Sequence, residues 1–309
     1  MSNKPTVFIH TNDQQIVGAY TALYSMKKAS DHPYAFDVKL VRLEETPHLL
    51  KRQGQPYLRK GKNAVWLNED LQSFSPLRRM VAQLMGFQGR AVVTDPDVFA
   101  IGDIYDLLTM DMNGKAILCR NVAEGYKSNG HKFYASSVML LDCAKLQHWR
   151  WDEDIDRMFA GELDYGPWIG LHTEDPATIG EISEDWNSFD KLTPSTKLLH
   201  TTERLTQPWK TGLPIDFDQT TKKRPRQTSL NLWGRIARKI GLSRPNEPTA
   251  DVPRYQPHPD VAQERLFFSL LKGAVEEGYV DRKLLSDSIT RKNVRPDAPQ
   301  ILAAAGLVI

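Results

Sequence analysis

Short apolar runs alternate with segments of helical periodicity over the first half of the chain. The apolar runs predict strands at 6–9, 36–41, 91–94, 116–119 and 137–142. Apolar residues at helical spacing predict helices at 16–26, 75–84 and 144–159. This alternation is typical of an α/β fold with a mixed, mainly parallel sheet flanked by helices. Such sheets bind ligands outside the carboxyl ends of their strands, where polar segments follow residues 9 and 94.

The pattern changes after about residue 217. Residues 222–228 are basic and contain proline, and residues 243–259 are rich in proline and polar side chains, as is typical of linkers. Beyond them, residues 260–279 carry apolar side chains at helical spacing, and a further helix is predicted near 283–288. We therefore expect an α/β domain over 1–218, a basic linker with an amphipathic helix over 219–259, and a helical C-terminal extension over 260–309.

The amphipathic helix of the linker region is predicted at 230–242. Its apolar stripe consists of Leu230, Trp233, Ala237 and Ile240, while Arg235, Arg238 and Lys239 lie away from that stripe. A helix of this kind lies in an anionic membrane surface, with the tryptophan at the interface. The alternative is that the apolar stripe packs on the protein's own core. The sequence leaves both interpretations open.

The overall composition places few limits on function. The 40 basic and 38 acidic side chains give a net charge of +2, so the bulk charge does not indicate binding to nucleic acid. Cys119 and Cys143 lie far apart without a CxxC pair, which argues against a cysteine-built zinc site and fits a reducing compartment. Because no apolar run approaches the length of a signal peptide or membrane span, we expect a cytoplasmic protein, peripheral on the inner face of the cell membrane if 230–242 binds lipid.

The most informative short segment is Asp95-Pro96-Asp97, which directly follows a predicted buried strand. Two carboxylates alternating across the proline can converge on one hard cation at the edge of the sheet, and oxygen ligands suit Mg²⁺ or Mn²⁺. The alternative is that the two aspartates cap the loop that precedes Ile104. The two residues alone do not decide between these interpretations.

Several further segments, which follow one another in a fixed order along the chain, favour the cation site over the loop cap. They resemble the sequence signature of glycosyltransferase family 8 and related GT-A enzymes. The resemblance rests on residues 74–79, 90–107, 135–142, 185–187, 197–202 and 207–212. It includes a strand followed by Asp-x-Asp, a Trp-Asn pair, and a closing histidine followed by a Pro-Trp segment.

The resemblance implies a GT-A catalytic domain over 1–218 in which Asp95, Asp97 and His200 bind Mn²⁺ or Mg²⁺. The donor substrate would be a UDP-sugar, and a hexose would pass to a carbohydrate, lipid-linked or protein acceptor with retention of anomeric configuration. A divalent ion and a nearby basic side chain would stabilise the charge that grows on the leaving diphosphate.

The resemblance also suggests which residues hold the donor. Arg78, or its neighbour Arg79, together with Asp95, Lys210 and Gly212, would lie at the phosphates. The loop after the first strand, with Thr11, Asn12 and Gln15, would hold the base and ribose. Its alternative role is a helix cap and turn, which favour the same residue types.

The sugar-facing acid is the least defined part of the site. Asp164 lies about where the family has an Asp-Gln element, and Glu174 and Asp175 are rivals. We take Asp164 and Asp175 as the catalytic candidates. Tyr165 and Ser136 stand where the family has other residues, so a non-catalytic glycan- or membrane-binding relative is one alternative function. A sugar nucleotidyltransferase is another, although residues 11–15 lack the glycine-rich loop of that class.

Overall fold

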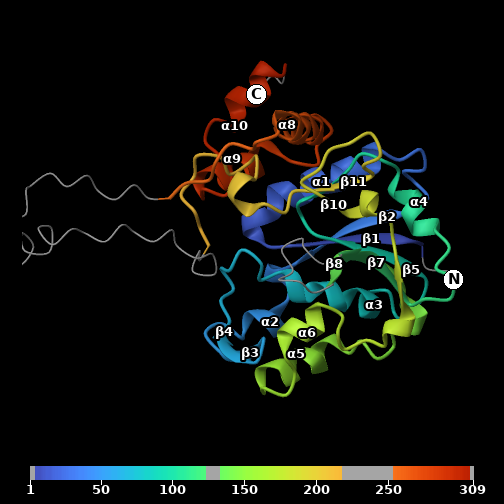
Figure 1. The fold of residues 1–309 in the computed structure, drawn as a ribbon. Coiled ribbons are helices and arrows are strands. Elements are labelled where there is room, and N and C mark those ends of the chain that lie inside the picture. Colours follow the sequence, from blue (N-terminus) through green and yellow to red (C-terminus); the bar gives the residue numbers. More distant parts are fainter. Residues whose placement is uncertain (1–3, 123–132, 218–252, 307–309) are drawn as a thin grey trace, which may run out of the picture.

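The computed structural model describes residues 4–122, 133–217 and 253–306 (Figure 1). Its centre is a six-stranded sheet with the order β2-β1-β5-β8-β7-β9. Only β8 runs antiparallel to its neighbours, β5 and β7, and the other three pairings are parallel. The expected mixed, mainly parallel sheet is therefore confirmed. The strands are β1 (Thr6–Thr11), β2 (Asp37–Arg42), β5 (Arg90–Thr94), β7 (Ile117–Val122), β8 (Phe133–Asp142) and β9 (Ile179–Glu181).

Helices cover both faces of this sheet, as Figure 1 shows. One face carries α1 (Ile16–Lys28), α4 (Ile104–Thr109) and α8 (Val261–Glu276), and the other carries α3 (Val81–Leu84), α5 (Trp151–Phe159) and α6 (Tyr165–Ile169). Each face has its own hydrophobic cluster. Strand β1 serves both, because Val7 and Ile9 belong to the cluster with α1 whereas Phe8 belongs to the other. This alternation follows from the two-residue period of a strand.

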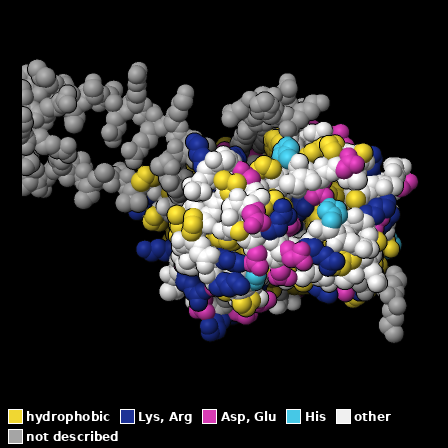
Figure 2. All heavy atoms as spheres, turned by 90° about the horizontal axis from the view of Figure 1, so that it is seen from below, with side chains coloured by type: hydrophobic (Ala, Val, Ile, Leu, Met, Phe, Trp, Pro, Cys, Tyr) yellow, Lys and Arg dark blue, Asp and Glu magenta, His cyan; other side chains and the backbone are white. Residues whose placement is uncertain are grey.

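Three smaller elements complete the α/β part. A short sheet is formed by β10 (Ser188–Phe189), β11 (Leu198–His200) and β6 (Val98–Ala100). A hairpin is formed by β3 (Pro56–Arg59) and β4 (Lys62–Val65), next to α2 (Pro47–Leu50). Figure 2 shows the molecule from below, and on the face seen there Lys and Arg side chains are interspersed with Asp and Glu side chains.

The C-terminal helices are α8, α9 (Arg282–Thr290) and α10 (Ala298–Ala304). Helices α8 and α9 pack on α1, and α10 packs on α8. Phe267, Leu271 and Leu302 lie in the same cluster as Val17. Gly273 allows the close approach, because a Cβ at that position would overlap the Tyr24 hydroxyl. Residues 230–242, the expected amphipathic helix, lie outside the described residues. Among the helices that are described, none is long and apolar enough to cross a membrane.

Two of the expected helices differ in form. Residues 75–84 begin as a 3₁₀ helix, Ser75–Met80, before α3. The helix expected over 144–159 begins only at Trp151, after a short 3₁₀ turn at Cys143–Lys145. Trp149 and Trp151 are both fully buried, and residues two apart on a continuous helix lie on nearly opposite sides. Burying both side chains in one core therefore requires the break.

Candidate metal and donor site

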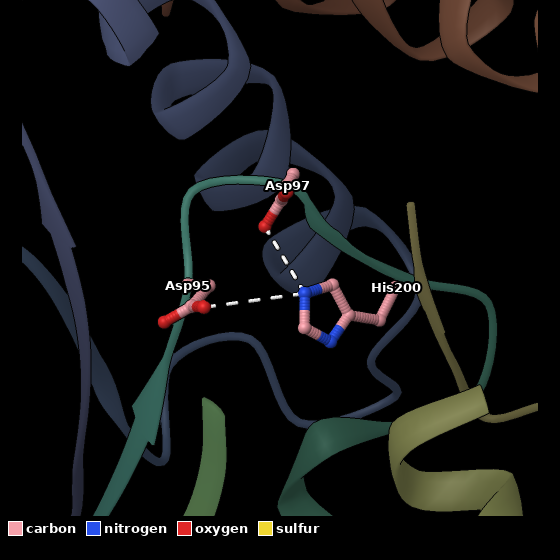
Figure 3. A group of neighbouring side chains, drawn as sticks. All are labelled: Asp95, Asp97 and His200. Atoms are coloured by element: carbon pink, nitrogen blue, oxygen red, sulfur yellow. Dashed lines mark ion pairs between the residues drawn. The ribbon is translucent and has the colours of Figure 1, made fainter. Parts of the chain in front are cut away.

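Asp95, Asp97 and His200 meet at the carboxyl end of β5. Asp95 directly follows that strand, and Asp97 lies in the turn that leads into β6. His200 ends β11, which pairs antiparallel with β6 so that His200 is opposite Val98. In Figure 3 the three side chains point toward one another from these separate segments. The pairing of β11 with β6 is thus what brings the histidine to the two aspartates.

The spacing of the three side chains suits a shared cation. Nε2 of His200 lies 3.3 Å from Oδ1 of Asp97 and 4.0 Å from Oδ2 of Asp95. One potential ligand atom from each residue lies within 4.8 Å of the others. Oδ1 of Asp97 is buried and accepts no hydrogen bond of normal geometry from the described residues, despite the nearby imidazole. A buried carboxylate oxygen without a donor is costly unless a cation compensates it.

The orientation of His200 also favours a cation. Its Nδ1 lies 2.9 Å from Oδ1 of Asn187, whose Nδ2 donates to Ser137 over 3.1 Å. With the amide oriented in this way, Nδ1–H of His200 is the donor, and the lone pair of Nε2 points at the two carboxylates. Histidines that bind metals are commonly held by such a hydrogen bond to the other ring nitrogen.

Electrostatics at His200 lead to the same conclusion. Burial by itself would lower the pKa of His200, but Asp97 and Asp95 raise it above its ordinary value overall. The carboxylates therefore favour a positive charge at Nε2, which either a proton or a divalent ion supplies. Two carboxylates and one imidazole are a donor set that accommodates Mn²⁺ or Mg²⁺, so the residues present fit the expected metal.

Asp95 is held by a second set of side chains. Nε of Arg78 donates to Oδ1 over 3.0 Å and Nη2 donates to Oδ2 over 2.6 Å. Nε2 of His10 lies 2.7 Å from Oδ1. Burial alone would raise the pKa of the Asp95 carboxyl, but Arg78 and His10 lower it well below its usual range. Burial lowers the pKa of His10, so the neutral ring donates its Nε2–H to a carboxylate that stays ionised.

A pocket of about 220 Å³ opens beside this cluster. Its lining includes all three candidate ligands together with Gln15, Phe74, Arg78, Arg204 and Gln207. Of the residues expected at the base and ribose, Gln15 therefore reaches the pocket. Thr11 and Asn12 are buried and outside its lining, and Nδ2 of Asn12 donates to Ser73 over 3.1 Å and to the carbonyl of Asp70 over 3.3 Å.

Lys210 and Gly212 do not line this pocket. The Lys210 side chain is fully buried, and its Nζ lies 2.5 Å from Oδ2 of Asp216. Gly212 has φ of +82°, a left-handed conformation that favours glycine, and its N–H donates to the carbonyl of Tyr255. Both residues therefore help to hold the segment around residue 212 against the segment around residue 255.

The acidic residues nominated for catalysis also lie outside the lining of the pocket. The Asp164 carboxylate caps α6 and accepts from the backbone of Lys60 and Gly61. Asp175 caps the 3₁₀ turn Pro176–Thr178 and is exposed. The third acid, Glu174, is buried in an ion pair with Arg79. Arg79 is thus committed to Glu174, and of the two neighbouring arginines it is Arg78 that contacts Asp95.

Sequence reasoning missed His10 and Asn187 as parts of the site. His10 lies near the carboxyl end of β1, beside β5, and that position is the signal that could have indicated it. Asn187 belongs to the Trp-Asn pair, but nothing local indicates that its partner is His200. The two cysteines are fully buried, and burial raises the pKa of both Cys119 and Cys143 to about 12, so neither is a nucleophile here.

No protein-family model and no curated protein matches the sequence. Similar solved structures include the bifunctional glycosyltransferase WbbM, at 10% identity and a TM-score of 0.47 over 68% of this chain and 48% of that one. They also include the glycosyltransferase GlyE of Streptococcus pneumoniae, at 15% identity and a TM-score of 0.45 over 67% and 57%. The galactosyltransferase LgtC matches at 14% identity and a TM-score of 0.44 over 66% and 89%.

The chain thus spans only about half the length of WbbM and GlyE. Likeness at this level does not establish an activity, so the functional conclusion depends on the geometry of the site.

Proposed function

We propose that this protein is a metal-dependent glycosyltransferase that moves a hexose from a UDP-sugar to a carbohydrate, lipid-linked or protein acceptor, with retention of configuration. The observation that supports it most directly is the cluster of Asp95, Asp97 and His200 at the carboxyl end of a parallel strand, where α/β sheets bind ligands. In this proposal residues 1–218 form the catalytic domain and residues 260–309 support it.

The chemistry requires a site that stabilises a departing nucleoside diphosphate. Asp95, Asp97 and His200 would hold Mn²⁺ or Mg²⁺, which when bound neutralises charge on the phosphates as the bond to the sugar breaks. Asn187 orients the imidazole of His200, and Arg78 with His10 orients the carboxylate of Asp95. These contacts preorganise the ligands, so little reorganisation is needed during the reaction.

The two candidate catalytic acids lie apart from the proposed metal site. Because Asp164 and Asp175 cap short helices outside the pocket, neither is positioned there as an enzymic base. Front-face attack assisted by the leaving phosphate does not require one, and that route accords with retention. Contact of residues 230–242 with the inner face of the cell membrane, in a cytoplasmic protein, is a further part of the proposal and would bring the enzyme to a lipid-linked acceptor.

The proposal is tested by measuring UDP release from UDP-glucose and UDP-galactose with and without Mn²⁺. We expect metal-dependent release by the wild-type protein and none above background by Asp97→Asn, which removes a ligand charge. Asp106→Asn is the matched control, because Asp106 is exposed on α4 and away from the pocket.

The outcomes separate the proposed enzyme from its alternative. Metal-dependent binding of UDP without release from either donor would favour the non-catalytic glycan-binding relative. A wild-type protein that binds neither Mn²⁺ nor UDP would contradict the proposal as a whole.

A further inference from the structure

A diphosphate bound beside the three candidate ligands needs a basic side chain in addition to the metal, and the residues that the structure describes offer three candidates. They are Arg78, Arg204 and Lys210. Their contacts in the structure differ, and the difference indicates which of them is available to an anion.

Arg78 is engaged with the protein itself. Its Nε and Nη2 donate to both oxygens of Asp95, and its Nη1 donates to the hydroxyl of Ser136 over 3.0 Å. A planar guanidinium that already forms this bidentate pair has its main donors committed. Arg78 therefore acts on the phosphates only indirectly, by fixing a metal ligand.

Lys210 is shielded from the pocket. Its side chain is fully buried, its ammonium forms an ion pair with Asp216, and the same carboxylate accepts a hydrogen bond from the Tyr255 hydroxyl. Exposing Lys210 to a ligand would break this pair and leave Asp216 uncompensated, which is costly for partly buried charges. Lys210 thus stabilises the fold around 210–216 and 255.

Arg204 has neither restriction. It lines the same pocket as Asp97 and His200, and it follows His200 by only four residues. It is half-buried, and its guanidinium lies 5.5 Å from the centre of the Phe217 ring. Among the residues that the structure describes, no carboxylate forms an ion pair with it. A guanidinium held over an aromatic ring keeps its in-plane N–H donors free for a phosphate.

We infer that Arg204, and not Lys210 or Arg78, is the basic side chain that binds the diphosphate of the donor. The inference rests on the proposed function and adds to it the residue that recognises the leaving group. Residues 200–207 would then supply both a metal ligand and the phosphate-binding cation from one short segment, so that metal and diphosphate are positioned relative to each other by local backbone geometry.

Isothermal titration with three probes tests this assignment: UDP, inorganic pyrophosphate and uridine, each in the presence of Mn²⁺. Arg204→Gln should weaken binding of UDP and of pyrophosphate by about tenfold or more, because a charge-assisted pair is lost. Uridine, which lacks phosphate, should bind as to the wild type. Arg204→Lys should fall between the two, since a lysine keeps the charge but not the bidentate geometry.

Two controls accompany the titration. Arg150→Gln removes an exposed arginine that likewise lies over an aromatic ring, 5.3 Å from the Phe87 centroid, and should leave all three affinities unchanged. Binding of Mn²⁺ alone, followed by electron paramagnetic resonance, should be the same in Arg204→Gln and the wild type, which also reports that the site is folded.

Unchanged affinity of Arg204→Gln for UDP and pyrophosphate, in a wild-type background that binds both, would overturn the assignment and leave the proposed function intact. Equal loss of uridine binding or of Mn²⁺ binding would also overturn it, because Arg204 would then act on the whole site. If the wild type binds no UDP with Mn²⁺, the proposed function fails and the assignment fails with it.

Discussion

Asn187 offers the sharpest test of how the metal site is built. It is fully buried and lies outside the lining of the pocket, and its side-chain oxygen accepts the Nδ1–H of His200 at 2.9 Å. Asn187→Leu keeps a side chain of similar size and removes both the acceptor for His200 and the Nδ2 donor to Ser137. Nδ1–H would then be a buried donor without a partner, and the imidazole would be free to rotate or change tautomer.

Two independent magnitudes apply to this change. Loss of a hydrogen bond to the non-ligating side of a metal-bound histidine typically weakens metal affinity by about 10- to 100-fold. A buried donor left unpaired costs about 1–3 kcal/mol, and about 1.4 kcal/mol corresponds to a factor of ten. Because the two ranges agree, we expect Asn187→Leu to raise the Kd for Mn²⁺ by about 10- to 100-fold.

The assay is a Mn²⁺ titration followed by electron paramagnetic resonance near pH 8, where protons compete less with the metal for Nε2. Ser137→Ala is the control, because it removes the other hydrogen bond of Asn187 and leaves the bond to His200. It should change the Kd only slightly. A folded Asn187→Leu protein with the Kd of the wild type would refute the conclusion that Asn187 positions His200, as would an equal loss in Ser137→Ala.

Two further predictions concern stability. Burial would raise the pKa of Glu174, but the Arg79 guanidinium and the hydrogen bond from His148 lower it overall, so its contribution to stability is present above the unfolded pKa and is lost as pH falls through the folded one. Glu174→Gln should therefore lower the free energy of unfolding by about 3–5 kcal/mol at pH 7. Urea unfolding from pH 7 to pH 3 should also show that this free energy falls less steeply with decreasing pH in the variant than in the wild type. The same slope of unfolding free energy against pH in both proteins would contradict this. Gly273→Ala should lower Tm through overpacking of about 1–3 kcal/mol against Tyr24, and an unchanged Tm would mean that α8 does not pack on α1 as described.

Much of the fold follows from local sequence patterns. Apolar runs with a period of two or with helical spacing depend only on neighbouring residues, and they indicated the principal strands of the central sheet and the helices α1 and α8. The position of Asp95 at the carboxyl end of a buried strand is equally local, because the strand and the acidic pair are contiguous. The sequence by itself therefore determined an α/β sheet with a carboxylate pair at its ligand-binding edge.

The resemblance already implied that His200 joins the two aspartates, and what only the tertiary structure decided is how this and other distant groups reach that edge. His200 is more than a hundred positions from Asp95, and it arrives through the antiparallel pairing of β11 with β6, two strands too short to be recognised from periodicity. The same holds for the bond from His200 to Asn187, and for the burial of Lys210 against Asp216 while Arg204 lines the pocket. These contacts depend on strand register and side-chain packing across the whole domain, and no local pattern carries that information.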